Sequence, residues 1–509
     1  MRSSPDSSHY DDLVVGSGMA GLAVASLLAK SGRRVLVLEA HDRPGGYAHT
    51  FPMKDYRFCA QVHYIFNCGE GESINLLLAR LGLVEKVPFV RLDPEGFDHV
   101  VVDGERTRIP NGLGKLEARL RRRFPEATTA LRRYFEIVVT LGRELERLNV
   151  PERALSLAAV RAAFDARHVL FYLRWTLQEL YDHVRMPLPL QAILAGQSGD
   201  YLLPPRDVSL LLHVSLVTLY DRGAYYPKYH YEQFVESLAD AVRNQPGCAL
   251  LLEHEVERIH TENGRVVGVS CTNGSKFTAE RYVSNADPRV TAKLTEGPAL
   301  PPARTDYEYS CGTITLYLGV RNLDLREHGF GSFNVWHYPN ADLNRIYDRQ
   351  LLEHDLSDPW LFLSTPTLHS DEPGLCPPGE QILEVATACD YRHWADLRTN
   401  DRRAYNREKK RIREQLLDVI ETRYVPELRR HLVMRVTGTP ATNERFCWAP
   451  EGNSYGARLD PKNVGPGRGA YRTGLENLWM ANATAGFPSV AGAVAAGMRL
   501  YEGFTGDTI

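Results

Sequence analysis

The sequence predicts an α/β fold in which one domain is assembled from the start, the middle and the end of the chain, with an α+β domain inserted between these segments. Three observations predict it. The chain opens with the pattern of a strand, a glycine turn, a helix and a second strand. Its middle has the pattern of a three-stranded meander, and its end that of a strand, a glycine-bearing loop and a helix. The first domain is expected in residues 1–112, 226–300 and 446–509, and the inserted domain in a helical part, 113–225, and a mixed part, 301–445.

The opening segment has the pattern of a Rossmann-type dinucleotide-binding site. An apolar run that begins near Tyr10 ends in Gly16-x-Gly18-x-x-Gly21, and a helical stretch then leads to a second apolar run that ends at Glu39. In such a site the first glycine makes a tight turn, the second lets the backbone approach a pyrophosphate, and the third lets helix and strand pack closely. The N-terminus of the helix offers free N–H groups to the phosphates. The carboxylate of Glu39 is placed to accept hydrogen bonds from a ribose.

Two further glycine-rich elements favour a flavin over a nicotinamide nucleotide. The run Arg43-Pro-Gly45-Gly46 follows the second strand, and a nicotinamide dehydrogenase has no need of it. The closing segment holds Asn482 and then a small-residue helix that starts near Ser489. The N–H groups at a helix N-terminus are good partners for the electron-rich edge of a reduced flavin. Tight packing of a glycine-rich helix is the alternative explanation of this segment, but together the three elements predict noncovalently bound FAD.

The meander is predicted from its turns. Asn263-Gly264 and Asn273-Gly274 each separate two runs in which apolar and polar residues alternate. An Asn-Gly pair between alternating runs is the strongest short-range signal of a β-hairpin. Two such pairs in succession predict three antiparallel strands.

The inserted domain is predicted to be helical first and mixed later. Residues 115–148 and 153–220 have helical periodicity, residues 305–395 hold several strand-like runs, and residues 401–424 form a charged helix. The arginines within 116–123 indicate a solvated helix face, with a patch for a membrane surface or an anionic substrate as the alternative.

Composition excludes several classes of function. The net charge of −3 at pH 7 gives no support to a nucleic-acid partner. No secretory signal and no run of about 18 apolar residues is visible, so we expect a cytoplasmic protein with at most peripheral membrane contact. The eight cysteines include no C-x-x-C pair, which favours reduced thiols and predicts no metal site. The oligomeric state is not predicted.

With these elements in place, the chain resembles the phytoene desaturase, carotenoid isomerase and retinol saturase group of FAD enzymes over nearly its whole length. The retinol saturase branch is the most similar. The resemblance is carried by the opening and closing segments, the meander, and the runs 58–65, 197–205, 225–227 and 438–445. It implies an FAD-binding Rossmann-type domain of the amine-oxidase-like kind with an inserted α+β substrate domain.

The resemblance also implies which residues contact FAD, with the backbone of Val256 at the adenine. The expected contacts are Gly16, Gly18, Gly21, Glu39, Arg43, Gly45, Gly46, Val256, Asn482, Ser489, Val490 and Ala491. The expected substrate is a long conjugated polyene.

Several positions depart from the pattern of the group. Tyr229 and His230 stand where relatives carry two glycines, Cys59 and Gln61 replace an acid and a glycine, and Ala483 stands where relatives carry an acid. These changes predict a pocket reshaped for a polyene with a polar or acidic end. Some relatives reductively close rings on polyenes in natural-product pathways, and the chain is compatible with such a role.

The expected reaction is hydride transfer from reduced flavin to the polyene, which also requires a proton donor. His63 is the first candidate because imidazole titrates near neutral pH, and Tyr64, Tyr226 and His230 are the others. The alternative role of each is packing. A nicotinamide donor, NAD(P)H, if one is used, should reach the flavin directly or through the substrate pocket, since no second nucleotide-binding motif is visible.

Three other functions remain open at the level of sequence. The same fold can run as a desaturase that passes hydride to FAD, or as a polyene isomerase without net redox change. The alternative of another class is a flavin-binding scaffold without catalysis.

Overall fold

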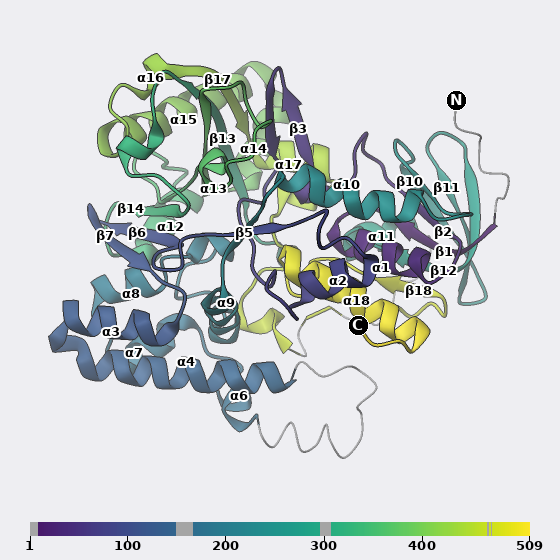
Figure 1. The fold of residues 1–509 in the computed structure, drawn as a ribbon, viewed down its shortest axis with the longest axis horizontal. Coiled ribbons are helices and arrows are strands. Elements are labelled where there is room, and N and C mark those ends of the chain that lie inside the picture. The colour runs from purple at the N-terminus through teal and green to yellow at the C-terminus, as the bar shows by residue number, and fades with distance from the viewer. Residues whose placement is uncertain (1–8, 149–165, 296–306, 466–467, 470) are drawn as a thin grey trace.

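The structure is a computed structural model that describes residues 9–148, 166–295, 307–465, 468–469 and 471–509 (Figure 1). Two large sheets organise it, one in each domain. The first sheet has the order β10 (Val256–Glu262), β11 (Arg265–Cys271), β12 (Lys276–Ser284), β1 (His9–Val15), β2 (Val35–Leu38), β9 (Ala249–Leu251), and β18 (Leu478–Met480) also pairs with β12. The second sheet has the order β17 (Leu432–Gly438), β13 (Gly312–Arg321), β16 (Glu380–Cys389), β15 (Leu361–Ser364), β14 (Asn334–Tyr338), β6 (Asp98–Val102), β7 (Glu105–Ile109).

The first sheet confirms the predicted domain built from distant segments. Strand β1 pairs in parallel with β2 and β12, and β12 pairs in parallel with β18, so the start, the middle and the end of the chain lie side by side. The predicted meander is present as β10, β11 and β12. Helix α1 (Met19–Lys30) follows β1, and it packs on the closing helix α18 (Val490–Thr505). Small residues allow this approach, because a Cβ at Gly497 would lie 2.7 Å from the Ala20 carbonyl oxygen.

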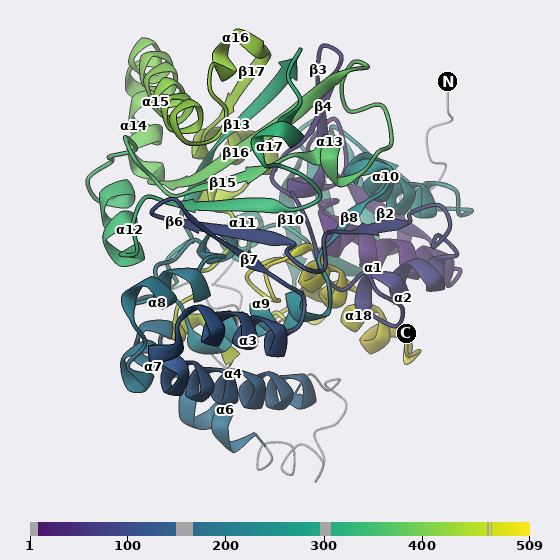
Figure 2. The same ribbon diagram turned by 60° about the vertical axis from the view of Figure 1, so that its left-hand side comes forward.

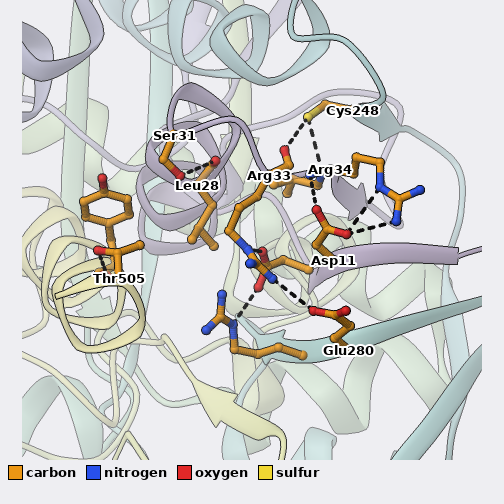
Figure 3. A network of polar contacts seen from close by, with 12 residues as sticks. Asp11, Leu28, Ser31, Arg33, Arg34, Cys248, Glu280 and Thr505 are labelled. Carbon is orange, nitrogen blue, oxygen red and sulfur yellow. Dashed lines mark hydrogen bonds and ion pairs between the residues drawn. The ribbon is translucent and has the colours of Figure 1, made fainter. Parts of the chain in front are cut away.

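A network of ion pairs joins β1 to the loop before β2 and to β12 (Figure 3). Asp12 is fully buried and forms ion pairs with Arg33 and with Arg281, whose Nε lies 2.6 Å from Asp12 Oδ1. Arg34 pairs with the neighbouring Asp11 at 3.0 Å. Since these arginines come from the loop before β2 and from β12, the network ties three adjacent strands together.

The second sheet takes two strands that the sequence analysis placed in the first domain. Strand β6 pairs in parallel with β14, and β7 pairs with β6, so residues 98–109 belong to the inserted domain and the first segment ends before the expected boundary at residue 112. The alternating pattern of these strands does not show which sheet they join, because that depends on partners more than 200 positions away. Strands β13, β15 and β16 confirm the strand-like runs expected within 305–395.

Helices cover the second sheet on two sides (Figures 1 and 2). On one side lie α14 (Tyr391–Asn400) and α15 (Arg402–Arg423), which confirms the charged helix. On the other side lie α3 (Leu113–Arg123), α4 (Thr128–Leu148), α6 (Arg167–Tyr172), α7 (Leu177–Val184), α8 (Leu188–Leu194) and α9 (Leu210–Arg222). The part of the predicted helical run within 153–165 falls outside the described residues. Arg119, Arg121 and Arg123 form ion pairs near the surface, which fits a solvated helix face.

Shorter elements complete the structure. They are β3 (Thr50–Met53), β4 (Tyr56–Cys59), β5 (Phe89–Arg91), β8 (Tyr225–Pro227), α2 (Ser73–Leu81), α10 (His230–Arg243), α11 (Pro288–Leu294), α12 (Leu343–Leu351), α13 (Pro366–His369), α16 (Leu428–His431) and α17 (Pro440–Cys447). Within the described ranges, no helix is both long enough and apolar enough to cross a membrane.

Candidate active site

A cavity of about 470 Å³ is lined by residues of both domains. One end meets the glycine turn between β1 and α1. The other reaches the second sheet and α9. The expected FAD contacts that line the cavity are Gly16, Gly18, Glu39, Arg43, Gly45, Gly46, Val256, Asn482, Ser489, Val490 and Ala491. The structure therefore brings together eleven of the twelve residues that the resemblance implied, and also His63 and Tyr64.

The glycine turn has the backbone shape that the motif requires. Gly16 has a φ of +95°, a conformation that side-chain-bearing residues rarely adopt. Gly45, with a φ of +116°, donates its N–H to the Ser17 carbonyl at 3.0 Å, which brings the second glycine pair onto the turn. A Cβ at Gly46 would lie 3.2 Å from the Gly18 Cα. Two stretches of bare backbone thus meet at the start of α1, where a phosphate can approach the N–H groups.

Gly21 is the one expected FAD contact that does not line the cavity. A Cβ at this position would lie 2.4 Å from the Gly16 carbonyl oxygen, closer than any real contact of this kind. Gly21 therefore serves the packing of α1 against the turn, the role the motif gave it, and not direct contact with the cavity.

We expect Gly21→Ala to distort the turn, because the atom it would meet is backbone and cannot swing away. Overpacking of this kind costs about 1–3 kcal/mol. If the glycine turn shifts to relieve the clash, the FAD dissociation constant should rise by about 10–100-fold. The control is Gly503→Ala in α18, where a Cβ meets nothing within 4 Å and should be neutral or stabilising. Equal FAD affinities in the two variants would contradict the assignment.

Glu39 is held at the end of β2 with its carboxylate at the cavity. Its Oε2 accepts a hydrogen bond from the Ser17 N–H at 2.8 Å, and its Oε1 accepts one from the His41 N–H at 2.9 Å. A carboxylate oxygen can accept more than one hydrogen bond, so this arrangement leaves capacity for ribose hydroxyls.

Glu39→Ala is expected to weaken FAD binding by about 10–150-fold, because a charge-assisted hydrogen bond of about 1.5–3 kcal/mol is lost. Titration of flavin-free protein with FAD, followed by fluorescence quenching, measures the effect. Glu39→Gln keeps a neutral acceptor, so its FAD dissociation constant should lie between those of the unmodified protein and Glu39→Ala. An unchanged dissociation constant for Glu39→Ala would remove this residue from the site.

The closing segment presents a helix N-terminus to the cavity. The Ser489 Oγ accepts the Gly492 N–H at 2.8 Å and so caps α18, while Val490 and Ala491 line the cavity. The side chain of Asn482 is used within the loop: its Oδ1 accepts the Thr484 N–H at 3.1 Å. Asn482 therefore shapes the loop, and its side chain does not replace the missing carboxylate. These features fit FAD along the cavity, with phosphates at α1 and the flavin toward α18.

The far end of the cavity carries the first catalytic candidate. His63 Nδ1 lies 2.6 Å from Glu384 Oε2, and the Glu384 side chain is only 2% exposed. The imidazole packs against Phe362, with ring centroids 5.0 Å apart. Because Nδ1 is bound by the carboxylate, Nε2 is the ring nitrogen that can serve a molecule in the cavity. A carboxylate on Nδ1 also fixes the orientation of the ring.

Comparison with known proteins agrees with this geometry. The model of a family described as flavin containing amine oxidoreductase matches residues 19–499. The chain belongs to the flavin-containing amine oxidoreductase family. It is 25% identical over 476 residues to the all-trans-retinol 13,14-reductase of Danio rerio, covering 88% of this chain and 77% of the relative. It is also 25% identical over 485 residues to prolycopene isomerase 2, chloroplastic, of an Oncidium hybrid cultivar, covering 90% and 77%.

The fold of this flavin-containing amine oxidoreductase is also found among solved structures. A variant of putrescine oxidase aligns with a TM-score of 0.66 at 15% identity, covering 98% of this chain and 99% of that protein. The predicted fold class and the predicted resemblance are thus confirmed. The protein is an FAD-dependent oxidoreductase, and the residues that line its cavity fit that cofactor.

Two of the sequence-predicted catalytic residues do not line the cavity of this flavin-containing amine oxidoreductase. Tyr226 is buried in β8 and packs against His369 and His230, with ring centroids 5.3 and 6.0 Å away. Tyr229 is 41% exposed. The geometry therefore gives no support to Tyr226 and His230 as proton donors, or to Tyr229 as a residue that shapes the substrate pocket. This segment pairs with β5, and its residues do not line the cavity.

His230 keeps the backbone conformation that a glycine would favour there. Its φ is +66° at the start of α10. We expect His230→Gly to be more stable than His230→Ala by about 1 kcal/mol, because only glycine adopts this conformation without strain. The neighbouring Tyr229 has a φ of −100°, so there the order should reverse. Chemical denaturation of the glycine and alanine variants at each position measures both differences in the free energy of unfolding. The same order of stability at both positions would contradict the explanation.

Sequence reasoning missed three acidic residues near the cavity. Glu384 was visible as a single acid among the apolar residues of 382–386, a pattern that predicts a buried charge with a partner. Asp98 and Asp200 contact Tyr64, and Asp200 belongs to a run that carried the family resemblance without a role assigned to it. Their partners come from distant parts of the chain, so no local signal identified them.

Proposed function

We propose that the protein uses reduced FAD to transfer hydride to a long conjugated polyene, by saturation or by reductive cyclisation. The observation that carries the proposal is one cavity that runs from the FAD residues to an aromatic wall holding His63. The aromatic lining residues at that end are Tyr64, Phe66, Tyr220, Trp336, Trp360 and Phe362. Flat aromatic faces suit a flat conjugated chain. The names of the two relatives, a retinol reductase and a prolycopene isomerase, support this substrate class.

Bound FAD supplies the two-electron chemistry, and the protein supplies orientation and a proton. His63 is placed to give a proton through Nε2 to a substrate carbon, while Glu384 holds the ring and balances its charge. A nicotinamide donor, if the protein uses one, would reach the flavin through this same cavity.

The charges of the cavity refine the expected substrate. Among the described lining residues, the only arginine or lysine is Arg43, at the FAD end, whereas Asp200 lies at the aromatic end. An acidic end group would therefore meet a carboxyl group and no arginine or lysine among the described lining residues. We propose a polyene whose polar end, if present, is neutral, in place of the acidic end that the sequence analysis allowed.

Anaerobic mixing tests the proposal against its alternatives. The protein is loaded with FAD, reduced, and mixed with all-trans-retinol or prolycopene as probes. We expect the flavin to be reoxidised and the product to gain two hydrogens. Bleaching of oxidised flavin by the polyene would instead show a desaturase. A product formed without net flavin change would show an isomerase, for which the prolycopene isomerase relative is the supporting observation. If neither polyene reacts, a flavin-binding scaffold without catalysis would be favoured.

A further inference from the structure

A second polar group lies in the wall of the cavity, separate from the His63–Glu384 pair. The Tyr64 hydroxyl lies 2.9 Å from Asp98 Oδ2 and 3.0 Å from Asp200 Oδ2. Asp98 is fully buried on β6, whereas Asp200 and Tyr64 line the cavity. We call these three residues the carboxyl array.

Counting hydrogens shows that the carboxyl array holds an extra proton. A tyrosine hydroxyl has one hydrogen and can donate to only one of the two carboxyl oxygens. The contact between the Tyr64 oxygen and the second carboxyl group is also at hydrogen-bond distance, so its hydrogen must come from that carboxyl group. Two ionised carboxylates carry no hydrogen and could not form both hydrogen bonds. One of the two aspartates is therefore protonated.

The neighbours of the array place that proton on Asp200. Gln197 Nε2 donates to Asp98 Oδ2 at 2.8 Å, and Asn334 Nδ2 donates to Asp98 Oδ1 at 3.4 Å. These two donors, in addition to Tyr64, favour the ionised form of Asp98, whereas Asp200 receives only tyrosine hydroxyls, from Tyr64 and Tyr220, among the hydrogen bonds of the described residues. Tyr64 then donates to Asp98, and Asp200 donates to the Tyr64 oxygen.

Burial agrees with this assignment. It raises the pKa of Asp98 to about 6 and, with the charge of Asp98 nearby, raises the pKa of Asp200 well above its usual range. The titratable groups that face the two carboxyls are all tyrosines apart from the aspartates themselves. They are Tyr64, Tyr201, Tyr220, Tyr338 and Tyr455. In the part of the chain that the structure describes, no cationic side chain is a cause of the pKa shift of Asp200.

We propose that Asp200 is a second proton donor of the site and that Asp98, acting through Tyr64, is the positioning residue that keeps it protonated. The inference rests on the proposed reduction of a polyene. Each reduction needs one proton, and where Asp200 supplies it in place of His63, the Asp200 O–H bond breaks and a C–H bond forms at one carbon of a substrate double bond. The other carbon takes hydride, with its electron pair, from reduced flavin. Asp200 is left as a carboxylate and regains a proton from water after the product leaves.

The stored proton can be tested without any turnover. Infrared difference spectra of the FAD-loaded protein in H₂O and D₂O at neutral pH should show the carbonyl stretch of a protonated carboxyl group. Asp200→Asn should remove this band, whereas Asp371→Asn, at a fully exposed carboxylate, should keep it. The absence of a band that responds to Asp200→Asn would overturn the proposal even if the protein reduces polyenes.

The donor role is tested by turnover of the same variants. Asp200→Asn should lower kcat by about 10²–10⁴-fold with FAD retained, and Asp200→Glu should restore part of it. Should Asp200→Asn fail to fold, Asp98→Asn provides the second test. Without the charge of Asp98, Asp200 loses its proton at lower pH, so the alkaline fall in activity should move to lower pH. An unchanged kcat in Asp200→Asn, or an unchanged pH profile in Asp98→Asn, would overturn the proposal.

Discussion

Replacing His63 by glutamine is expected to slow turnover by about 10²–10⁴-fold while the protein keeps its FAD, because a general acid is lost and the cofactor end of the cavity is untouched. Glutamine can still donate a hydrogen bond to Glu384, which avoids leaving a buried carboxylate without a partner. Single-turnover oxidation of the reduced, FAD-loaded variant by the polyene measures the rate. FAD content is read from the absorbance of the same sample.

A second histidine–glutamate pair in the molecule provides the control. His168 Nδ1 lies 2.5 Å from Glu144 Oε1, and neither residue lines the cavity. His168→Gln should leave the rate within about twofold, since the pair has no access to the substrate. A His63→Gln variant that turns over at the rate of His168→Gln would reduce His63 to a packing residue.

Glu384→Gln separates positioning from proton transfer. The variant keeps His63 but replaces the carboxylate that balances a protonated ring. We expect a smaller loss of rate, about 10–100-fold, because the imidazole remains as the donor but its ring is held less firmly by a neutral amide. A rate as low as that of His63→Gln would show that the role of Glu384 cannot be separated from that of His63.

Asp12→Ala is expected to destabilise the protein by about 2–4 kcal/mol. The fully buried carboxylate pairs with Arg33 and Arg281, and its loss leaves two guanidinium groups without their common partner. The expected loss is below that of a fully buried pair because the two arginine side chains are 31% and 17% exposed. Urea denaturation of the FAD-free protein measures it without a contribution from the cofactor.

Glu280→Ala is the matched control for Asp12→Ala. Glu280 contacts the same Arg33 at 3.5 Å, but its side chain is 62% exposed. Exposed pairs contribute about 0–1 kcal/mol, so this variant should change stability little. If the two variants lose equal stability, the burial of Asp12 is not what makes the network important.

The local structure around the glycine turn is predicted well from sequence because its signals are local. Gly16, Gly18 and Glu39 belong to one continuous segment in which backbone conformation, helix start and strand end follow from neighbouring residues. The same holds for the two Asn-Gly turns of the meander and for the helix capped by Ser489. Local geometry of this kind needs no knowledge of how the rest of the chain packs.

The substrate end is a different case, since its contacts join distant residues. His63 was predicted, but its partner Glu384 lies 321 positions away on a strand of the second sheet. Tyr64 joins Asp98 and Asp200 from two further segments. A strand pattern shows that one face is buried, but it does not show which residue of another segment will meet that face.

The sequence alone was enough to predict the fold class and the cofactor, and it identified eleven residues that line the cavity, because each depends on short motifs with fixed backbone geometry. Only the tertiary structure decided which catalytic candidates reach the cavity. It placed His63 and Tyr64 there and turned Tyr226 and His230 away, although all four belong to motifs of the same group. The physical reason is that the direction of a side chain depends on strand pairing and on the packing of one sheet against distant helices, and these are settled only when the whole chain folds.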